Sequence, residues 1–106
     1  MSEIKRGDVY WAQLDPTIGA EIQKTRPVVV ISNSSINKAR KTVVVVPLST
    51  SAPVIQYLNV GLTGGSVARC DHIRAIDKSR LSNKIGMVAT KDMDAILDAL
   101  KKILDK

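Results

Sequence analysis

Two valine-rich segments close together in the chain limit most strongly how this sequence can fold. Residues 28–31 read Val-Val-Val-Ile and residues 42–46 read Thr-Val-Val-Val-Val, and such β-branched residues favour extended backbone. Apart from Thr42, both segments are continuously apolar instead of alternating, which is typical of strands buried on both faces. Pro27 and Asn33 bound the first segment, and Pro47 is expected to end the second because proline cannot donate a hydrogen bond within a sheet. Both segments therefore predict strands inside the core.

Turn residues separate the other apolar segments. Residues 9–14 predict a first strand, and 15–26 predict a loop because Asp15, Pro16 and Gly19 interrupt the apolar pattern. Further strands are expected within 54–62 and 66–76, on either side of a Gly-Gly turn, and a last short strand at 86–88. The chain thus predicts roughly five or six short strands.

Only the C-terminal segment has the three-and-four spacing of an amphipathic helix. The residues on its apolar face are Met93, Ile96, Leu97, Leu100, Ile103 and Leu104. Thr90 is the predicted N-cap, with aspartates at 92 and 94 in the first turn and lysines at 101, 102 and 106 near the end, as the helix dipole favours. We therefore expect residues 1–106 to form one domain of the mainly β, α+β class: a compact, mostly antiparallel barrel or bent sheet packed on this helix.

The net charge and the composition indicate which binding partners and which cellular compartment to expect. A net charge of +6 suits a polyanion such as a nucleic acid, with an acidic protein as the competing interpretation. No apolar run approaches the roughly 20 residues that span a bilayer, and the polar N-terminal segment does not resemble a secretory signal, so a cytoplasmic protein is expected. With one cysteine, Cys70, and one histidine, His72, no intrachain disulfide, metal or cofactor is predicted. Trp11 is expected in the core, because an aromatic content of 3% supplies no base-stacking platform.

The candidate catalytic and binding residues are polar residues at predicted strand ends. The sequence contains no phosphate-binding loop, nucleophile elbow or metal-binding helix motif that would indicate other candidates. These residues are Glu21, Arg26, Ser49, Thr50, Arg69, Asp71 and His72. Arg26 precedes a buried strand, where its guanidinium can hold a phosphate through two parallel hydrogen bonds or form a structural ion pair with Glu21. Ser49 and Thr50 offer hydroxyls either to phosphate oxygens or to a turn.

The segment around Asp71 offers an acid and base pair. Apolar and polar residues alternate over 67–71, so Arg69 and Asp71 are predicted to share one face of a strand, either around a scissile phosphate or in an ordinary salt bridge. The same pattern predicts that Cys70 packs inside and that His72 points away from Asp71. His72 is nevertheless an alternative base or phosphate contact, because imidazole titrates near neutrality.

The order and spacing of these residues resemble the MazF/PemK/Kid toxin family over essentially the whole chain. The matching segments are Arg6-Gly7-Asp8-Val9-Tyr10-Trp11, Leu14-Asp15-Pro16, Gly19-Ala20-Glu21, Thr25-Arg26-Pro27-Val28-Val29-Val30, Val45-Val46-Pro47-Leu48-Ser49-Thr50 and Arg69-Cys70-Asp71-His72-Ile73-Arg74-Ala75-Ile76-Asp77. The resemblance implies a small SH3-like Greek-key barrel, a homodimer, and the toxin of a type II toxin–antitoxin system. The implied activity is that of a metal-independent, sequence-specific endoribonuclease (mRNA interferase), in which the 2′-hydroxyl of single-stranded RNA attacks the adjacent phosphate.

The resemblance also implies roles for individual residues. Asp71 would be the base that takes the 2′-hydroxyl proton, Arg69 the acid or stabiliser at the leaving oxygen, and Arg26 the clamp on developing phosphate charge. Ser49 stands where relatives commonly have threonine, and Ala20 stands where some relatives have histidine. The implied RNA contacts are Glu21, Lys24, Thr50, Val67 and His72. An acidic antitoxin segment that folds across the dimer is the implied protein partner.

Two other functions are compatible with the same fold. The CcdB branch inhibits gyrase and carries a C-terminal Trp-Gly-Ile signature, whereas the only tryptophan here is Trp11. A non-catalytic RNA-binding barrel would bind RNA with the same salt dependence and leave it intact.

Overall fold

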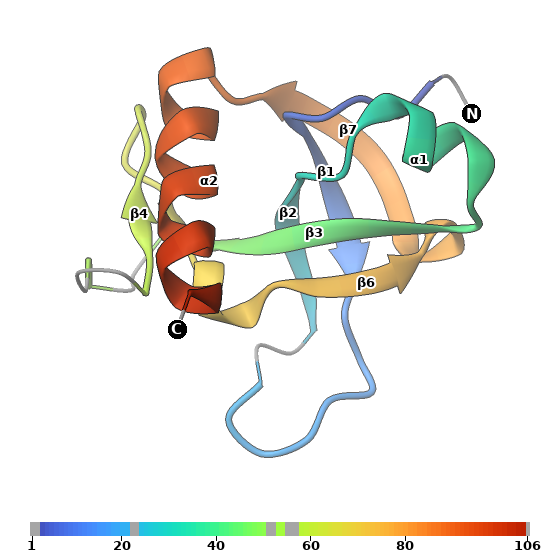
Figure 1. Ribbon diagram of the computed structural model, residues 1–106. Helices are drawn as coiled ribbons and strands as arrows, with labels where there is room; N and C mark the ends of the chain where they lie inside the picture. The colour runs from blue at the N-terminus through green and yellow to red at the C-terminus, as the bar shows by residue number, and fades with distance from the viewer. Residues whose placement is uncertain (1–2, 22–23, 51–52, 55–57, 106) are drawn as a thin grey trace.

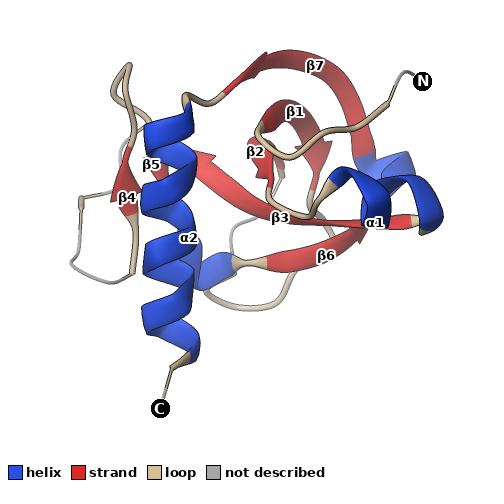
Figure 2. Ribbon diagram, turned by 45° about the horizontal axis from the view of Figure 1, so that its top comes forward, coloured by secondary structure: helices blue, strands red, loops and turns tan. Residues whose placement is uncertain are grey.

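The computed structural model describes residues 3–21, 24–50, 53–54 and 58–105, and within them seven antiparallel strands form one curled sheet (Figures 1 and 2). The strands are β1 (Asp8–Gln13), β2 (Thr25–Val30), β3 (Thr42–Ser49), β4 (Val60–Gly61), β5 (Val67–Ala68), β6 (Arg74–Asp77) and β7 (Leu81–Met87). The helical elements are α1 (Ser34–Ala39), α2 (Thr90–Leu104) and the 3₁₀ turns η1 (Cys70–His72) and η2 (Lys78–Arg80). The strand order is β4-β5-β3-β2-β1-β7, with β6 also paired to β3. The predicted mainly β, barrel-like fold with a C-terminal helix is confirmed.

Strand β3 is central because partners pair with both of its edges. One edge pairs with β2, where Val28 lies opposite Pro47. The other edge pairs with β6 over residues 42–45 and with β5 over residues 48–49. The chain between β5 and β6 therefore lies beside Pro47, where one partner strand ends and the next begins.

Both valine-rich segments are buried on both faces, as predicted. The core inside the curl contains Tyr10, Ala12, Leu14, Val28, Val30, Val43 and Val45. The core between the sheet and α2 contains Val9, Val29, Ile31, Val46, Leu48, Met93, Ile96, Ala99 and Leu100. Successive side chains of a strand point to opposite faces, which is why alternate valines belong to different cores. At the end of β3, this alternation directs Pro47 and Ser49 to one face and Leu48 to the helix-covered face.

The predicted C-terminal helix is confirmed with two corrections. Its N-cap is Ala89, which makes no side-chain capping bond, and Thr90 is the first helical residue. Asp92 in the first turn is buried and accepts the backbone N–H of Thr63 at 3.1 Å. Leu104, predicted on the buried face, is 72% exposed because the end of α2 extends past the sheet (Figure 2).

Several predicted boundaries are wrong. Strand β2 begins at Thr25, so Arg26 lies in a strand and not in the preceding loop. Strand β3 continues through Pro47 to Ser49, and the carbonyl of Pro47 accepts the N–H of Arg69 at 2.8 Å. The last strand spans 81–87 instead of 86–88.

Two other predicted strands are interrupted, and one helix was not predicted. Within 54–62 only Val60–Gly61 is a strand among the described residues, and 55–57 lie outside them. The segment 66–76 is divided into β5, η1 and β6. Helix α1 was not predicted, although the side chain of Asn33 caps it by accepting the N–H of Ile36. Trp11, expected in the core, is 40% exposed on β1.

Candidate functional site

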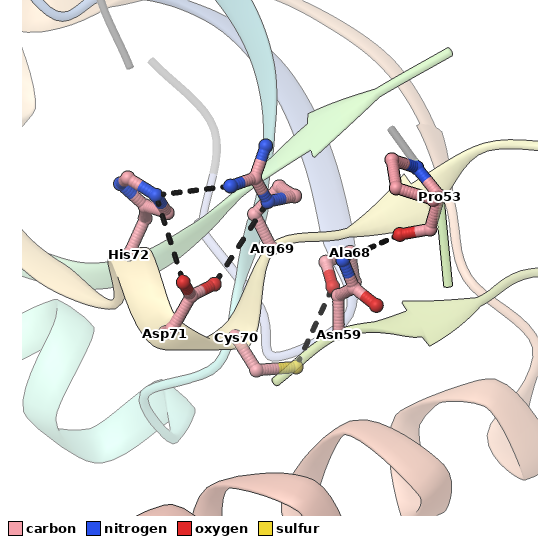
Figure 3. Close-up of polar contacts among 7 residues, drawn as sticks. All are labelled: Pro53, Asn59, Ala68, Arg69, Cys70, Asp71 and His72. Carbon is pink, nitrogen blue, oxygen red and sulfur yellow. Dashed lines mark hydrogen bonds and ion pairs between the residues drawn. The ribbon is translucent and has the colours of Figure 1, made fainter. Parts of the chain in front are cut away.

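The chain turns sharply after β5, and this turn carries most of the candidate residues. Strand β5 ends at Ala68, and the N–H of His72 donates to the carbonyl of Arg69 at 3.0 Å to form the turn η1. Cys70 is fully buried in the core that faces α2, with its Sγ 3.7 Å from the carbonyl oxygen of Ala68 (Figure 3). The buried sulfur anchors the turn and leaves its polar side chains on the solvent side.

The strand expected over 67–71 is therefore wrong beyond Ala68, and so is the expected separation of His72 from Asp71. In a tight helical turn, side chains close in sequence gather together instead of alternating across a sheet. Figure 3 shows Arg69, Asp71 and His72 pointing toward one another. The predicted proximity of Arg69 and Asp71 is confirmed, but the turn produces it and not strand alternation.

The three polar side chains form a compact cluster. Arg69 Nη2 lies 3.2 Å from His72 Nε2, within hydrogen-bond distance. Asp71 Oδ2 lies 3.7 Å from His72 Nε2, and Asp71 Oδ1 lies 3.8 Å from Arg69 Nε. Both carboxylate distances exceed a hydrogen bond, so Asp71 interacts with its neighbours through charge and its oxygens can still accept a proton. The side chains of Arg69, Asp71 and His72 are 28%, 31% and 21% exposed, respectively, so all three are accessible to a ligand.

Cys70 packs beside this cluster without sharing its chemistry. Burial, with a smaller contribution from the Asp71 carboxylate, raises the pKa of its thiol to about 11. The thiolate is the nucleophilic form of cysteine, and a thiol with this pKa remains protonated at neutral pH. The expectation that Cys70 packs inside is confirmed.

A cleft of about 490 Å³ opens beside the turn. The residues that line it come from the β1–β2 loop, from β3 and from the chain that enters β6. They are Ile18, Ala20, Glu21, Pro47, Asp71, His72, Ile73 and Arg74. The structure thus brings Glu21 and His72, which are far apart in the sequence, into one cleft.

Two arginines hold the start of the β1–β2 loop in place. Arg74 Nη1 donates to the carbonyl of Leu14 at 3.2 Å. Arg80 Nη1 donates to the carbonyl of Gln13 at 3.0 Å and to that of Asp15 at 2.5 Å. Sequence reasoning did not identify this supporting role. The Arg-x-Ile-Asp pattern at 74–77 drew attention to Arg74, whereas no sequence pattern marks Arg80.

Arg26 and Ser49 lie on the sheet face that Pro47 shares. Val28 pairs with Pro47, and extending this register by two residues places Arg26 opposite Ser49. Ser49 in turn pairs with Val67 on β5. Paired residues of neighbouring strands, and residues two apart in one strand, share a face. Arg26, Ser49 and Val67 therefore form a row across three strands that leads to Pro47 at the cleft.

The remaining candidates, Lys24 and Thr50, lie close to this row along the chain. Lys24 has a left-handed backbone with a φ of 70°, and its carbonyl accepts the N–H of Leu14 at 3.0 Å. Thr50 directly follows β3 and is exposed. Neither is among the described residues that line the cleft.

The described residues form neither a metal-binding cluster nor a membrane-spanning helix. Among them, no group of three or more histidine, cysteine, aspartate or glutamate side chains is close enough to hold a metal ion. None of the helices in this part of the chain is both long enough and apolar enough to cross a membrane.

Solved structures identify the class of fold. The crystal structure of MazF (Form-I) from Deinococcus radiodurans matches with a TM-score of 0.89 at 21% identity, covering 98% of each chain. An endoribonuclease in complex with its cognate antitoxin from a mycobacterial species matches with a TM-score of 0.81 at 26% identity, covering 95% of this chain and 94% of that one. The curled sheet with its terminal helix and polar edge therefore has the fold of the MazF-type toxins.

Sequence comparison then identifies the family. Residues 5–104 match the sequence profile described as PemK-like, MazF-like toxin of type II toxin–antitoxin system. Endoribonuclease PemK of Escherichia coli is 33% identical over 111 residues, covering 97% of this chain and 84% of PemK. Endoribonuclease EndoA of Bacillus subtilis (strain 168) is 35% identical over 106 residues, covering 92% of this chain and 91% of EndoA. The chain belongs to the PemK-like, MazF-like toxin family.

Proposed function

We propose that this chain is the toxin of a type II toxin–antitoxin system, a metal-independent endoribonuclease that cleaves single-stranded RNA, including mRNA, at a specific sequence. It acts in the cytoplasm as one toxin domain over residues 1–106. The observation that carries the proposal is the cluster of Arg69, Asp71 and His72 at the cleft, beside the row that contains Arg26 and Ser49. The relatives PemK and EndoA, named as endoribonucleases, support the same activity.

The reaction uses a nucleophile that the RNA itself supplies. Asp71 takes the proton of a ribose 2′-hydroxyl as its oxygen attacks the adjacent phosphorus. The bond from phosphorus to the 5′-oxygen of the next nucleotide then breaks, which leaves a 2′,3′-cyclic phosphate and a 5′-hydroxyl. A single strand suits this route, because its nucleotides can rotate until the attacking and leaving oxygens are in line.

Positive charge and hydroxyl groups stabilise the phosphorane-like transition state. Arg26 presents a planar guanidinium from β2, which can bind two phosphate oxygens in parallel. Ser49, opposite it in the extended register, donates its hydroxyl to a non-bridging oxygen. Arg69, in contact with the cleft residue His72, stabilises charge on the leaving oxygen. Each group that is positioned in advance to stabilise charge developing only in the transition state raises the rate about 10²–10³-fold.

The residues at the borders of the row and cleft contact the rest of the RNA. Lys24 and Thr50 meet the phosphate backbone, and Val67 supplies apolar contact to a base. Glu21 and His72 meet polar groups from the lining of the cleft. Carboxylates accept hydrogen bonds from base amino groups, so Glu21 can contribute to base preference.

Two protein partners belong to the proposal. A second copy of the chain forms the homodimer, and an acidic antitoxin segment covers the same basic surface that RNA uses. The net charge of +6 supports both anionic ligands, because each gains from displaced counterions or paired charge. RNA and antitoxin are therefore expected to compete.

The test is to incubate the purified protein with a long single-stranded RNA in excess EDTA and to map the ends produced. Discrete cuts with cyclic-phosphate ends are expected, and Arg26→Ala is expected to reduce their rate about 10²–10³-fold. Arg40→Ala is the matched control, because Arg40 is an exposed arginine that ends α1 through its backbone. Intact RNA with folded protein would sink the nuclease proposal and leave RNA binding or gyrase inhibition to be assayed. Equal activity of both variants would exclude Arg26 from the site.

A further inference from the structure

Cleavage by this route needs a proton donor for the leaving 5′-oxygen, and Arg69 is poorly suited to that task. An alkoxide is a poor leaving group, so protonating it as the bond breaks is worth about 10²–10⁴ in rate. A guanidinium has an ordinary pKa above about 12 and does not readily release its proton near neutral pH. Arg69 can stabilise negative charge at this oxygen, but another group must supply the proton.

His72 is the neighbouring group with suitable chemistry. It is the only histidine in the chain, and imidazole ordinarily gives and takes a proton at about pH 6.5. Its Nε2 lies 3.2 Å from Arg69 Nη2 and 3.7 Å from Asp71 Oδ2 (Figure 3). The side chain is 21% exposed and lines the cleft, so it is accessible to substrate while packed against both partners.

We propose that His72 is the general acid of the reaction, an inference that rests on the proposed ribonuclease function. Asp71 accepts the 2′-hydroxyl proton while the 2′-oxygen bonds to phosphorus. As the bond from phosphorus to the 5′-oxygen breaks, protonated Nε2 of His72 gives its proton to that oxygen. Asp71 is then protonated and His72 neutral. Both side chains are partly exposed, so exchange with water removes the proton from Asp71 and returns one to His72 Nε2 before the next turnover.

The contacts of Nε2 differ between the two protonation states of the imidazole. Arg69 Nη2 can donate to Nε2 only when that nitrogen carries no proton, which is its state after the transfer. In the protonated state Nε2 is itself a donor, so the imidazolium turns from Arg69 toward the leaving oxygen, with the Asp71 carboxylate as its ion-pair partner. The charged groups around His72 are Asp71 on its own turn, Arg69 before it, Arg74 on β6 and Glu21 on the β1–β2 loop.

The experiment uses two versions of one short single-stranded RNA with a mapped cleavage site: ordinary RNA, and RNA with sulfur in place of the bridging 5′-oxygen. A thiolate leaves without being protonated, so loss of a general acid does not slow cleavage of the sulfur RNA. His72→Gln is expected to slow single-turnover cleavage of ordinary RNA about 10²–10⁴-fold, and that of the sulfur RNA by less than about threefold. Asp71→Asn is the matched control, because loss of the base is expected to slow both RNAs.

Several results would overturn the inference. Equal slowing of both RNAs by His72→Gln would assign His72 to RNA binding or to support of Arg69, and an unchanged rate on ordinary RNA would remove it from the reaction. The wild-type pH profile provides a check that needs no variant. Cleavage of ordinary RNA is expected to decline at alkaline pH as the imidazolium is lost, and the sulfur RNA should not show this decline. Equal declines would refute the acid role, whereas a wild-type protein that cuts neither RNA would refute the ribonuclease function itself.

Discussion

Replacing Ile96 with alanine tests the packing of α2 on the sheet. Ile96 is fully buried in the core between them. The substitution removes three carbons, which costs about 2.4 kcal/mol at about 0.8 kcal/mol per buried methylene. The remaining cavity, at most about 80 Å³, adds up to about 2 kcal/mol. We therefore expect the free energy of unfolding to fall by about 3–4 kcal/mol and the Tm by about 10–30 °C.

Leu104→Ala on the same helix is the matched control. Leu104 is 72% exposed, so its truncation should change the free energy of unfolding by less than about 0.5 kcal/mol. Urea unfolding followed by far-ultraviolet circular dichroism measures both variants, at one protein concentration because association makes unfolding concentration-dependent. A loss below about 1 kcal/mol for Ile96→Ala, or equal losses for the two variants, would refute this description of the core.

Two further predictions concern the surroundings of the site. Because burial raises the pKa of the Cys70 thiol from 9.0 to about 11, the folded protein holds this proton more tightly than the unfolded chain. The thiol therefore contributes its full stabilisation below about pH 9, and the free energy of unfolding should fall by up to about 2.7 kcal/mol as the pH rises toward 11. Urea titrations at several pH values should show this fall for the wild type but not for Cys70→Ala. Equal dependence of the free energy of unfolding on pH in both proteins would contradict the prediction. Arg80→Ala removes the hydrogen bonds to the carbonyls of Gln13 and Asp15, and in steady-state RNA cleavage it should raise KM about fivefold with little change in kcat. Lys78→Ala, which removes the same charge from η2, should leave KM nearly unchanged, and an equal rise in both variants would refute a role for the two hydrogen bonds.

The elements that could be predicted are those whose local pattern is unambiguous. The segments 28–31 and 43–46 are apolar at every position, and two cores indeed cover them. Helix α1 could not be predicted, because tertiary hydrogen bonds hold it. Its buried Asn37 donates to the carbonyls of Ile4 at 3.1 Å and Ser32 at 2.9 Å, which no helical periodicity encodes.

In the candidate site, too, one part could be predicted from local sequence and another part could not. The alternating pattern over 67–71 predicted that Arg69 and Asp71 lie together, and the structure brings them within 3.8 Å through a turn instead of a strand. The position of His72 could not be predicted, because strand alternation and a 3₁₀ turn are equally compatible with the sequence around Cys70. Burial of Cys70 against the core that α2 completes accompanies the turn.

The sequence by itself determined the family, the two strands buried on both faces, the terminal amphipathic helix and the types of chemical group available to the site. These depend on residue order and short-range periodicity, which are properties of the chain alone. Only the tertiary structure decided that Trp11 and Leu104 are exposed, that His72 joins Arg69 and Asp71, and that Arg80 supports the start of the β1–β2 loop. Those outcomes depend on which distant segments pack together, and local sequence does not specify distances between segments far apart in the chain.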